Sequence, residues 1–371
     1  MAENYKKFKY IHVFNGSNYG TINSFTALIN KRFDPAEHLI IVKDKKNNPK
    51  ETISCYENVI WLPGAEHEER EKFLRLLTAG EIIFWHAMGW GWRMQAVIDS
   101  DSELIRRSVW VEWGADLYNW KRTEGGLLRR AFVNSVCKSW RRNVLATVAI
   151  FPTDVEVIKK QFGRRMTVLT AGYCSMYAED TEKLRPSQEK APGAPLNVQV
   201  GHSATPACHH IDALEKLSAY RDENILIHIP LTYGDPEYAI RVERKALELF
   251  PENKIRFQKQ QLPLEEYIKY LWSMDVGVFN VERQIALGNI AQLLYMLKKV
   301  YLPKDSVLGR YYAENDAYYC DYALLGSEDF AAFSAGIPRT EPADCVLRYM
   351  SEKSVTAEWR IVFAAVLKLL K

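Results

Sequence analysis

The feature that most constrains the fold is an alternation of short apolar runs with helical patterns, present twice along the chain. In the first half, apolar runs typical of strands cover residues 10–14, 39–42, 59–62, 81–86, 109–112 and 144–149. Helical patterns between them cover 22–31, 68–78 and 127–139. In the second half, strands are predicted at 196–200, 225–229, 255–258, 276–279 and 300–302, and helices at 211–219, 237–249, 264–272 and 290–298. Such alternation indicates βαβ units around mostly parallel sheets.

Chain length and one polar segment predict two domains. A chain of 371 residues exceeds the size at which one hydrophobic core usually stops growing. Residues 181–195 are polar, contain prolines and read as a linker. We therefore expect a Rossmann-like domain over residues 1–180 and a second over 196–353, facing a cleft. Apolar residues recur at helical spacing near the C-terminus, and residues 354–371 are expected to form a helix that packs back on the first domain.

Composition excludes several classes of protein. A net charge of +3 gives no basis for nucleic acid as a partner. No uninterrupted apolar run reaches the roughly 18 residues needed to span a bilayer. The six cysteines are scattered without a CxxC pair, so neither a disulfide framework nor a zinc ribbon is indicated. No signal peptide is apparent, and we expect a cytoplasmic protein.

The turn from Glu282 to Asn289 is the strongest candidate for binding an anion. It follows an apolar strand and opens an apolar helix, where free backbone N–H groups and the helix dipole favour negative charge. Arg283 supplies a fork of donors suited to phosphate, and Gln284 stands beside it. Gly288 permits close approach of the backbone, and the amide of Asn289 follows it. The simpler alternative is a polar turn with a solvated arginine.

Further turns at predicted strand ends of the second half are expected to line the same pocket. Gly201 and Ser203 follow the strand at 196–200, and Tyr233 follows the strand at 225–229. Several such turns in one domain resemble a nucleotide-diphosphate site. His210 begins a predicted helix beside this pocket. The neighbouring histidines and Cys208 match no standard zinc spacing, and we expect neither a metal nor a cofactor.

Three residues of the first half are candidates for chemistry on an acceptor. Asp116 lies in a turn after the strand at 109–112 and is a candidate base, or else a helix cap. Glu112 is the alternative base, or else a strand residue facing solvent. His86 ends the strand at 81–86 and is a candidate acceptor contact, or else a packed histidine. The residues leave open which carboxylate acts as the base.

The segment 121–142 combines basic and apolar residues. Its basic side chains include Arg129, Arg130, Arg141 and Arg142. A basic amphipathic helix of this kind is typical of attachment to an anionic membrane surface, although a solvated helix face is the more common reason for such a pattern.

Several short elements, taken in order along the chain, resemble glycosyltransferase family 56. These are the WGADLY element at 113–118, Val200–Ser203 with His210-Ile211 and Ala213-Leu214, then Pro230 with Tyr233-Gly234 and Tyr238, Arg283-Gln284 with Gly288, and His86 after the fourth strand. The family contains the TDP-N-acetylfucosamine:lipid II N-acetylfucosaminyltransferases of enterobacterial common antigen synthesis. Departures include His202 where the family has Asn, and Asn289 where it has Thr after the glycine.

The resemblance implies an α/β protein of GT-B type with a nucleotide-sugar donor in the C-terminal domain. It implies a polyprenyl-diphosphate-linked saccharide as acceptor, no essential metal, and peripheral attachment to the inner face of the cytoplasmic membrane. We therefore expect a hexosyltransferase acting in cell-surface polysaccharide synthesis. The alternatives are a GT-B transferase with another donor and a non-lipid acceptor, a nucleotide-sugar-binding protein without turnover, and a sugar epimerase. The donor sugar, the stereochemical outcome and the oligomeric state are left open.

Overall fold

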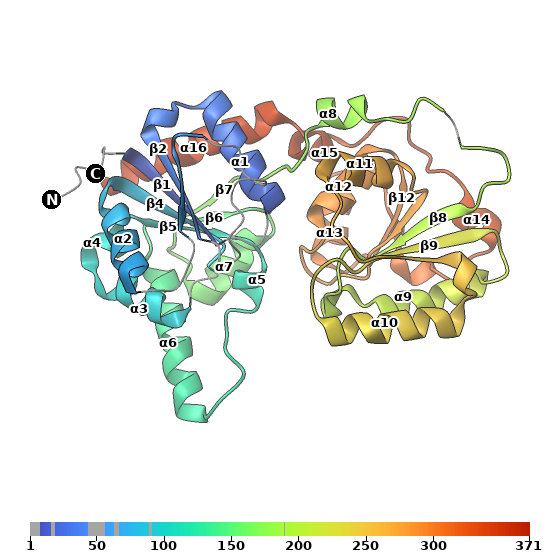
Figure 1. Ribbon diagram of the computed structural model, residues 1–371, viewed down its shortest axis with the longest axis horizontal. Coiled ribbons are helices and arrows are strands. Elements are labelled where there is room, and N and C mark those ends of the chain that lie inside the picture. Colours follow the sequence, from blue (N-terminus) through green and yellow to red (C-terminus); the bar gives the residue numbers. More distant parts are fainter. Residues whose placement is uncertain (1–7, 16–18, 44–55, 63–66, 89–90, 189) are drawn as a thin grey trace. The chain divides into compact units, whose positions relative to one another are not determined.

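The computed structural model describes residues 8–15, 19–43, 56–62, 67–88, 91–188 and 190–371. The chain divides into two compact units, shown in Figure 1. Unit 1 contains residues 1–175 and 352–371, and unit 2 contains residues 176–351. Each unit is built around its own parallel β-sheet.

The sheet of unit 1 has seven strands in the order β3-β2-β1-β4-β5-β6-β7. The strands are β1 (Phe8–Asn15), β2 (His38–Lys43), β3 (Val59–Leu62), β4 (Gly80–His86), β5 (Ser108–Glu112), β6 (Ala146–Ala149) and β7 (Val168–Thr170). All of their pairings are parallel. After β1, the chain builds one side of the sheet through β2 and β3 and then returns to place β4 on the other side of β1. This reversal is the switch point at which doubly wound sheets bind ligands, beyond the carboxyl ends of the strands.

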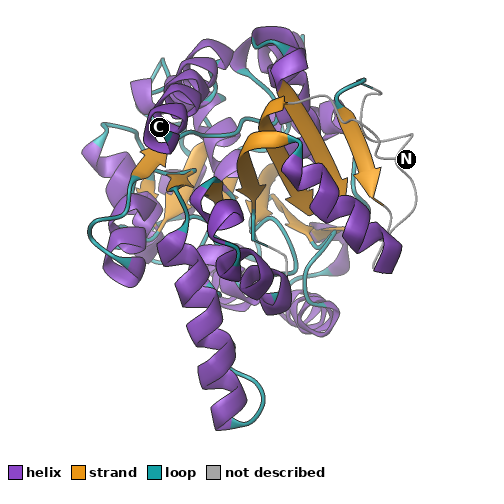
Figure 2. Cartoon of the chain, turned by 90° about the vertical axis from the view of Figure 1, so that its left-hand side faces the viewer, coloured by secondary structure: helices purple, strands orange, loops and turns teal. Residues whose placement is uncertain are grey.

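The helices of unit 1 cover both sides of this sheet (Figure 2). They are α1 (Tyr19–Arg32), α2 (His67–Thr78), α3 (Trp92–Ser100), α4 (Ser102–Arg106), α5 (Ala115–Tyr118), α6 (Leu127–Asn143), α7 (Asp154–Phe162) and α16 (Glu352–Leu370). The last of these, α16, comes from the C-terminus and packs into unit 1. Its Trp359 is fully buried and donates a hydrogen bond from Nε1 to the carbonyl of Gly172 at 3.0 Å.

The sheet of unit 2 has six strands in the order β10-β9-β8-β11-β12-β13, again all parallel. The strands are β8 (Leu196–Val200), β9 (Ile225–Pro230), β10 (Ile255–Gln258), β11 (Val276–Val278), β12 (Lys299–Leu302) and β13 (Cys320–Asp321). The helices are α8 (Ala178–Lys183), α9 (His210–Leu217), α10 (Pro236–Leu249), α11 (Leu264–Trp272), α12 (Leu287–Tyr295), α13 (Val307–Glu314), α14 (Phe330–Ser334) and α15 (Asp344–Tyr349). Here the order reverses between β8 and β11, so the switch point lies between these two strands.

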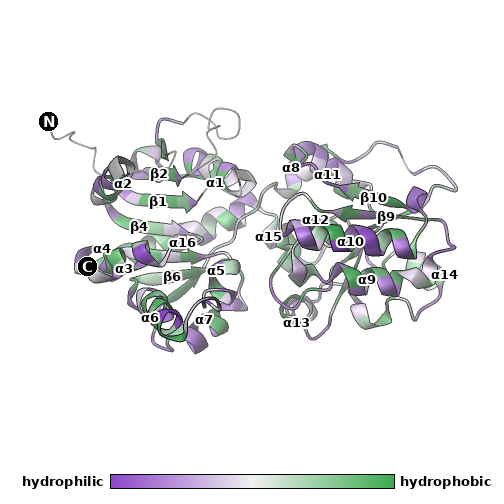
Figure 3. Ribbon diagram, turned by 60° about the horizontal axis from the view of Figure 1, so that its bottom comes forward, coloured by the Kyte–Doolittle hydropathy of each residue, from purple (hydrophilic) through white to green (hydrophobic). Residues whose placement is uncertain are grey.

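Capping residues explain where a helix starts, and the distribution of apolar residues explains which faces of the helices and strands are buried. Asp235 caps α10 by accepting hydrogen bonds from the amides of Glu237 and Tyr238, and Pro236 occupies the first helical position. The inner strands are buried on both faces, as expected for parallel sheets covered by helices. In Figure 3 the flanking helices show both hydrophobic and hydrophilic residues, because one face packs on the sheet and the other meets solvent. None of the described helices is both long and apolar enough to cross a membrane.

The polar segment expected as a linker lies within unit 2. Thr181 in α8 is buried, and its hydroxyl donates to Oε1 of Gln292 at 3.1 Å. The indole of Trp272 donates to the carbonyl of Thr181 at 3.1 Å. The chain passes between the units at Ser175–Met176 and again at Ser351–Glu352. Composition favoured a later boundary because the exposed residues after α8 are polar, while the contacts that hold α8 in unit 2 are not visible in sequence.

Candidate active site

The turns after β8, β9 and β11 meet at the carboxyl edge of the unit 2 sheet. The amide of Gly201 donates to the carbonyl of Val278 at 3.0 Å, which joins the ends of β8 and β11 at the switch point. The amide of Ala204 donates to the carbonyl of Tyr233 at 2.7 Å, which joins the turns after β8 and β9. The structure therefore brings Gly201, Ser203 and Tyr233 to one edge.

Gly201 has a backbone that a larger residue would strain. Its φ is +64°, and a Cβ built at this position would lie 2.3 Å from Nε2 of His210. His210 is fully buried, and this Nε2 atom has no hydrogen-bond partner among the described residues. Burial lowers the pKa of His210 to about 3, so the imidazole is neutral at physiological pH.

The predicted anion turn precedes α12. This helix has Ala286 as its N-cap, with a φ of +63° and no side-chain cap, so a ligand can take the place of a cap at its first amides. Arg283 is half-buried, and its charge acts to lower the pKa of the Cys208 thiol, against the larger raising effect of burial. Arg283 therefore lies near the turn after β8. Gln284 is buried, and its Nε2 lacks a hydrogen-bond partner within the described part of the chain.

Two residues of this edge were missed by sequence reasoning. Gln199, fully buried in β8, donates from Nε2 to the carbonyl of Gly201 at 2.9 Å and to Oδ1 of Asn289 at 3.1 Å. Tyr267 in α11 donates its hydroxyl to the same Oδ1 of Asn289. Gln199 was detectable as a polar residue inside an apolar strand. Tyr267 carries no comparable signal, because its pairing with Asn289 depends on the packing of α11 against α12.

The carboxyl edge of the unit 2 sheet exposes an aromatic ring close to several polar groups. Tyr233 is 61% exposed, and its ring lies edge-on to that of His202 with centroids 6.0 Å apart. Gly288 is also exposed, while Ser203 is buried and its hydroxyl is 2.9 Å from that of Thr205. An exposed aromatic ring beside helix-start amides and an arginine is suited to a ligand with a flat ring and an anionic group.

In unit 1, Asp116 is held by three hydrogen bonds. Its Oδ2 accepts from the amide of Met88 and from the indole of Trp110, both at 2.7 Å, and its Oδ1 accepts from the amide of Trp113 at 2.8 Å. A carboxylate has about four acceptor positions, so one on Oδ1 remains for a ligand. Asp116 is half-buried and retains access to solvent.

Glu112 is an internal carboxyl, not a base that faces an acceptor. It is fully buried, and its two oxygens accept from the amides of Gly114 at 2.7 Å and Ile150 at 3.0 Å. Burial raises its pKa well above the ordinary value, and the nearby carboxylates of Asp154 and Asp116 raise it further. The side chain therefore connects the end of β5 to the end of β6. The sequence offered two roles for Glu112, a catalytic base and a strand residue that faces solvent, and its buried position matches neither.

His86 is likewise internal. It is fully buried, with Nε2 2.9 Å from Nδ1 of His12 and with Nδ1 hydrogen-bonded to the hydroxyl of Tyr173. His12 continues the chain of hydrogen bonds to His38 at 3.0 Å. Because both ring nitrogens have internal partners, the packed histidine considered from the sequence describes His86 better than an acceptor contact.

Arg141 was expected to face a membrane, and the structure contradicts this. Only 2% of it is exposed, and it lies over the ring of Trp110 at 4.9 Å. Its Nη2 donates to the carbonyl of Asp116 at 3.0 Å, and its Nη1 donates to Oε1 of Gln95 at 2.9 Å. Arg141 therefore positions the turn that carries Asp116. Arg129 and Arg142 are exposed on α6, and Arg130 is half-buried.

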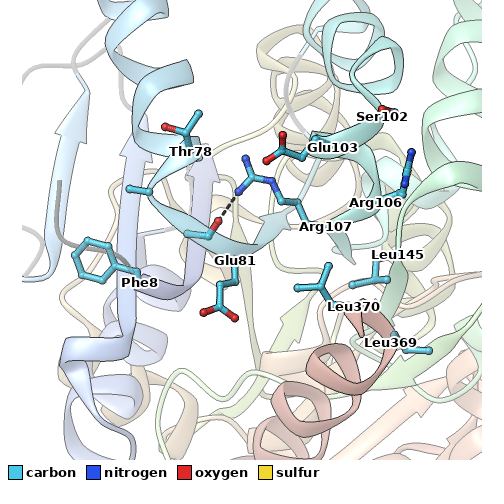
Figure 4. Close-up of a pocket in the computed structure, with 12 residues that line it drawn as sticks. Phe8, Thr78, Glu81, Ser102, Glu103, Arg106, Arg107, Leu145, Leu369 and Leu370 are labelled. Carbon is cyan, nitrogen blue, oxygen red and sulfur yellow. Dashed lines mark hydrogen bonds between the residues drawn. The ribbon is translucent and has the colours of Figure 1, made fainter. Parts of the chain in front are cut away.

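A cavity of about 700 Å³ opens at the opposite edge of the unit 1 sheet (Figure 4). It lies at the amino ends of β1 and β4, beside the end of α16, and Arg107 projects into it while donating to the carbonyl of Gly80. The candidate residues at the carboxyl edge do not line it. Among the described residues, no group of three or more His, Cys, Asp or Glu side chains is arranged to hold a metal ion.

Comparisons with known proteins agree with this architecture. The structure is similar to a glycosyltransferase from Rickettsia africae, with a TM-score of 0.60, 12% identity and coverage of 98% of this chain and 100% of that one. It is similar to Anabaena HepE in complex with UDP and glucose, with a TM-score of 0.66, 10% identity and coverage of 96% and 99%. It also resembles the trehalose 6-phosphate synthase of Burkholderia multivorans, with a TM-score of 0.63, 10% identity and coverage of 98% and 97%.

At such low identity these structures establish the fold alone, which is the two-domain GT-B architecture expected from the sequence. The family model for 4-alpha-L-fucosyltransferases, glycosyl transferase group 56, matches residues 92–306, more than half of the chain. This match spans the Asp116 turn and the carboxyl edge of unit 2. The chain therefore belongs to glycosyl transferase group 56 and is a glycosyltransferase of GT-B fold.

Proposed function

We propose that this glycosyltransferase moves a deoxy-acetamido sugar from a TDP-N-acetylfucosamine-like donor to a polyprenyl-diphosphate-linked saccharide. The family description, 4-alpha-L-fucosyltransferase, supports a deoxy sugar. The resemblance to the lipid II transferases supports the lipid-linked acceptor. Such an acceptor would place the protein peripherally at the inner face of the cytoplasmic membrane, in cell-surface polysaccharide synthesis.

The observation that carries the proposal is the set of hydrogen-bond donors at the start of α12. Arg283 stands beside a helix start without a side-chain cap, and the buried Nε2 of Gln284 lacks a partner in the described structure. The donor's diphosphate would accept hydrogen bonds from these groups and from the amides of Gly288 and Asn289. Tyr233 would stack on the base or the sugar, with Gly201, Ser203 and His210 lining the same edge.

In the proposed reaction, the acceptor hydroxyl oxygen bonds to the anomeric carbon of the donor sugar. The bond from that carbon to the diphosphate oxygen breaks, and the nucleoside diphosphate leaves with the electron pair. Arg283 and the helix-start amides stabilise the charge that develops on the leaving group, which removes the need for a metal. Asp116 takes the hydroxyl proton through its remaining acceptor position, while the indole of Trp110 keeps the carboxylate oriented and Arg141 holds the backbone carbonyl of Asp116.

The first test is thermal stabilisation by a panel of nucleoside diphosphates and nucleotide sugars. We expect one TDP- or UDP-type ligand to raise the melting temperature of the native chain and of Arg244→Ala, an exposed arginine on α10. Arg283→Ala should lose the effect. No shift with any nucleotide would exclude the donor site.

The second test is transfer to a lipid-linked acceptor, with and without EDTA. Turnover that EDTA leaves unchanged, and that Asp116→Asn lowers by about a hundredfold or more, would support the mechanism. Transfer to soluble acceptors alone would favour the GT-B alternative, and binding without turnover would favour a sensor protein. Release of an altered nucleotide sugar in the absence of acceptor would favour an epimerase.

A further inference from the structure

The first turn of α6 presents apolar side chains to solvent. The helix projects from unit 1 (Figures 1 and 2), and its C-terminal half is buried through Trp140 and Arg141. At its start, Leu127 is 76% exposed, Leu128 89% and Phe132 60%. The two leucines are the most exposed large hydrophobic residues in the part of the chain that the structure describes. We call residues 121–132 the α6 tip.

The α6 tip is held in place by specific hydrogen bonds. Asn134 accepts from the amide of Arg122 at 2.7 Å and donates to its carbonyl at 3.2 Å, which fastens the preceding loop to the helix. Arg130 donates from Nη1 to the carbonyl of Thr123 at 2.8 Å. The ring of Phe132 packs edge-on against Trp92, with centroids 5.8 Å apart. These contacts hold the loop and the first turns of α6, which carry the two leucines, against each other and against unit 1.

Positive charge surrounds the apolar side chains. The tip contains four basic residues, Lys121, Arg122, Arg129 and Arg130, and one acidic residue, Glu124. Its excess of three positive charges equals that of the whole chain, whose net charge is +3. Arg129 and Lys121 are exposed. Apolar residues surrounded by basic ones match the order of a bilayer that contains anionic lipids, with acyl chains below negative headgroups.

We propose that the α6 tip inserts Leu127, Leu128 and Phe132 into an anionic lipid bilayer, with Lys121 and Arg129 at the level of the headgroups. A protein partner fits less well, because a stable protein interface takes about 20–30 residues on each side, and a projecting tip offers few. Insertion of the tip differs from the arrangement that the basic pattern of the sequence predicted, in which the whole helix lies along the membrane surface. In that arrangement Arg141 would face lipid, whereas in the structure Arg141 is buried. The inference deepens the proposed function, since a lipid-linked acceptor must be met at a membrane.

The test is flotation with vesicles, without donor or acceptor. Vesicles of phosphatidylcholine with phosphatidylglycerol are compared with vesicles of phosphatidylcholine alone. We expect the native chain to bind the anionic vesicles, and Leu127→Ser/Leu128→Ser/Phe132→Ser to lose more than about tenfold in affinity. Lys121→Glu/Arg129→Glu should lose binding to anionic vesicles most strongly at low salt.

The matched control is Ile240→Ser/Leu247→Ser on α10, where the side chains are 57% and 49% exposed. It should bind vesicles as the native chain does. Equal binding by the native chain and the triple serine variant, with both melting at the same temperature, would overturn the inference. A native dimer in sedimentation velocity that the triple serine variant breaks would overturn it too, since the tip would then be a contact between copies.

Transfer to a water-soluble acceptor analogue separates this inference from the proposed function. The triple serine variant should retain that activity while losing vesicle binding. If the native chain binds vesicles through the tip but transfers no sugar, the proposed function fails and this inference stands. If transfer proceeds and the tip variants bind vesicles normally, this inference fails alone.

Discussion

Gly201 has a backbone conformation that favours glycine, and it lies at the edge of the sheet that we propose binds the donor. We expect Gly201→Ala to destabilise the protein by about 2 kcal/mol or more and to abolish nucleotide binding. The new Cβ would meet Nε2 of His210 at 2.3 Å in a residue whose φ is +64°. Urea unfolding and nucleotide titration measure the two effects.

Gly193→Ala is the matched control for this change. Gly193 also has a positive φ, +79°, but a Cβ there meets nothing within 4 Å. The difference between the two variants isolates the collision with His210, and Gly201→Ala/His210→Ala should recover part of the loss. Equal destabilisation by both glycine changes would show that backbone strain alone accounts for the effect.

Gln199 is the buried residue that connects the turn after β8 to the start of α12. Gln199→Leu removes the hydrogen bonds to the carbonyl of Gly201 and to Asn289, and we expect nucleotide affinity to fall roughly thirtyfold, since two such bonds together contribute about 2 kcal/mol. A double-mutant cycle with Asn289→Ala, measured by titration calorimetry, tests the connection. Additive effects of the two changes would mean that Gln199 does not act through Asn289.

At the scale of elements, α16 supplies much of the aromatic packing of unit 1. Trp359 is fully buried and contacts the rings of Phe25 and Phe84. We expect Trp359→Ala to cost about 3–5 kcal/mol of unfolding free energy through the cavity that it leaves. Ile361→Ala, on the same helix but 65% exposed, should change the unfolding free energy by less than about 0.5 kcal/mol. Similar losses from both variants in urea titrations would contradict this packing.

The elements differ in how far the sequence predicts them. Apolar runs predicted the inner strands correctly, because a parallel strand that is covered by helices on both faces is apolar along its whole length. The short edge strands β7 and β13 were missed, since three residues and two residues carry too little pattern. The two Rossmann-like domains were predicted correctly, because the alternation of strands and helices restarts in the second half, and the resemblance to family 56 implied that they form a GT-B fold.

Only part of the candidate site could be predicted, because contacts between residues far apart in the sequence leave no local pattern. Turns at strand ends follow from chain order, so Gly201, Tyr233 and Arg283 could be named in advance. The burial of Glu112, His86 and Arg141 depends on contacts with Ile150, His12 and Gln95, which are far away in sequence. A basic pattern on a helix does not reveal which of its arginines turns inward.

At the scale of the whole molecule, buried neutral histidines in both units couple folding to pH. In unit 1, burial lowers the pKa of His38 to about 4 and that of His12 and His86 well below the ordinary 6.5. In unit 2, burial lowers the pKa of His202 and His228 to about 4 and that of His210 to about 3. Folding therefore favours the neutral form of these six imidazoles.

The direction of the pH effect follows from where the protons bind. Below about pH 6.5 the unfolded chain takes up protons on these histidines and the folded chain does not, so acid favours unfolding. Each histidine with a folded pKa of about 4 contributes about 3 kcal/mol that is present above pH 6.5 and is lost as the pH falls toward 4. Glu112 acts in the opposite direction, because its raised pKa lets the folded state hold a proton that the unfolded state releases.

We expect the unfolding free energy to fall steeply between about pH 6.5 and about pH 4, since six histidines outweigh one carboxyl. Urea titrations across this range measure the slope. His228→Gln should flatten the slope by removing one of the titrating groups. A free energy that stays constant down to pH 5 would mean that the buried histidines take up protons as readily in the folded chain as in the unfolded one.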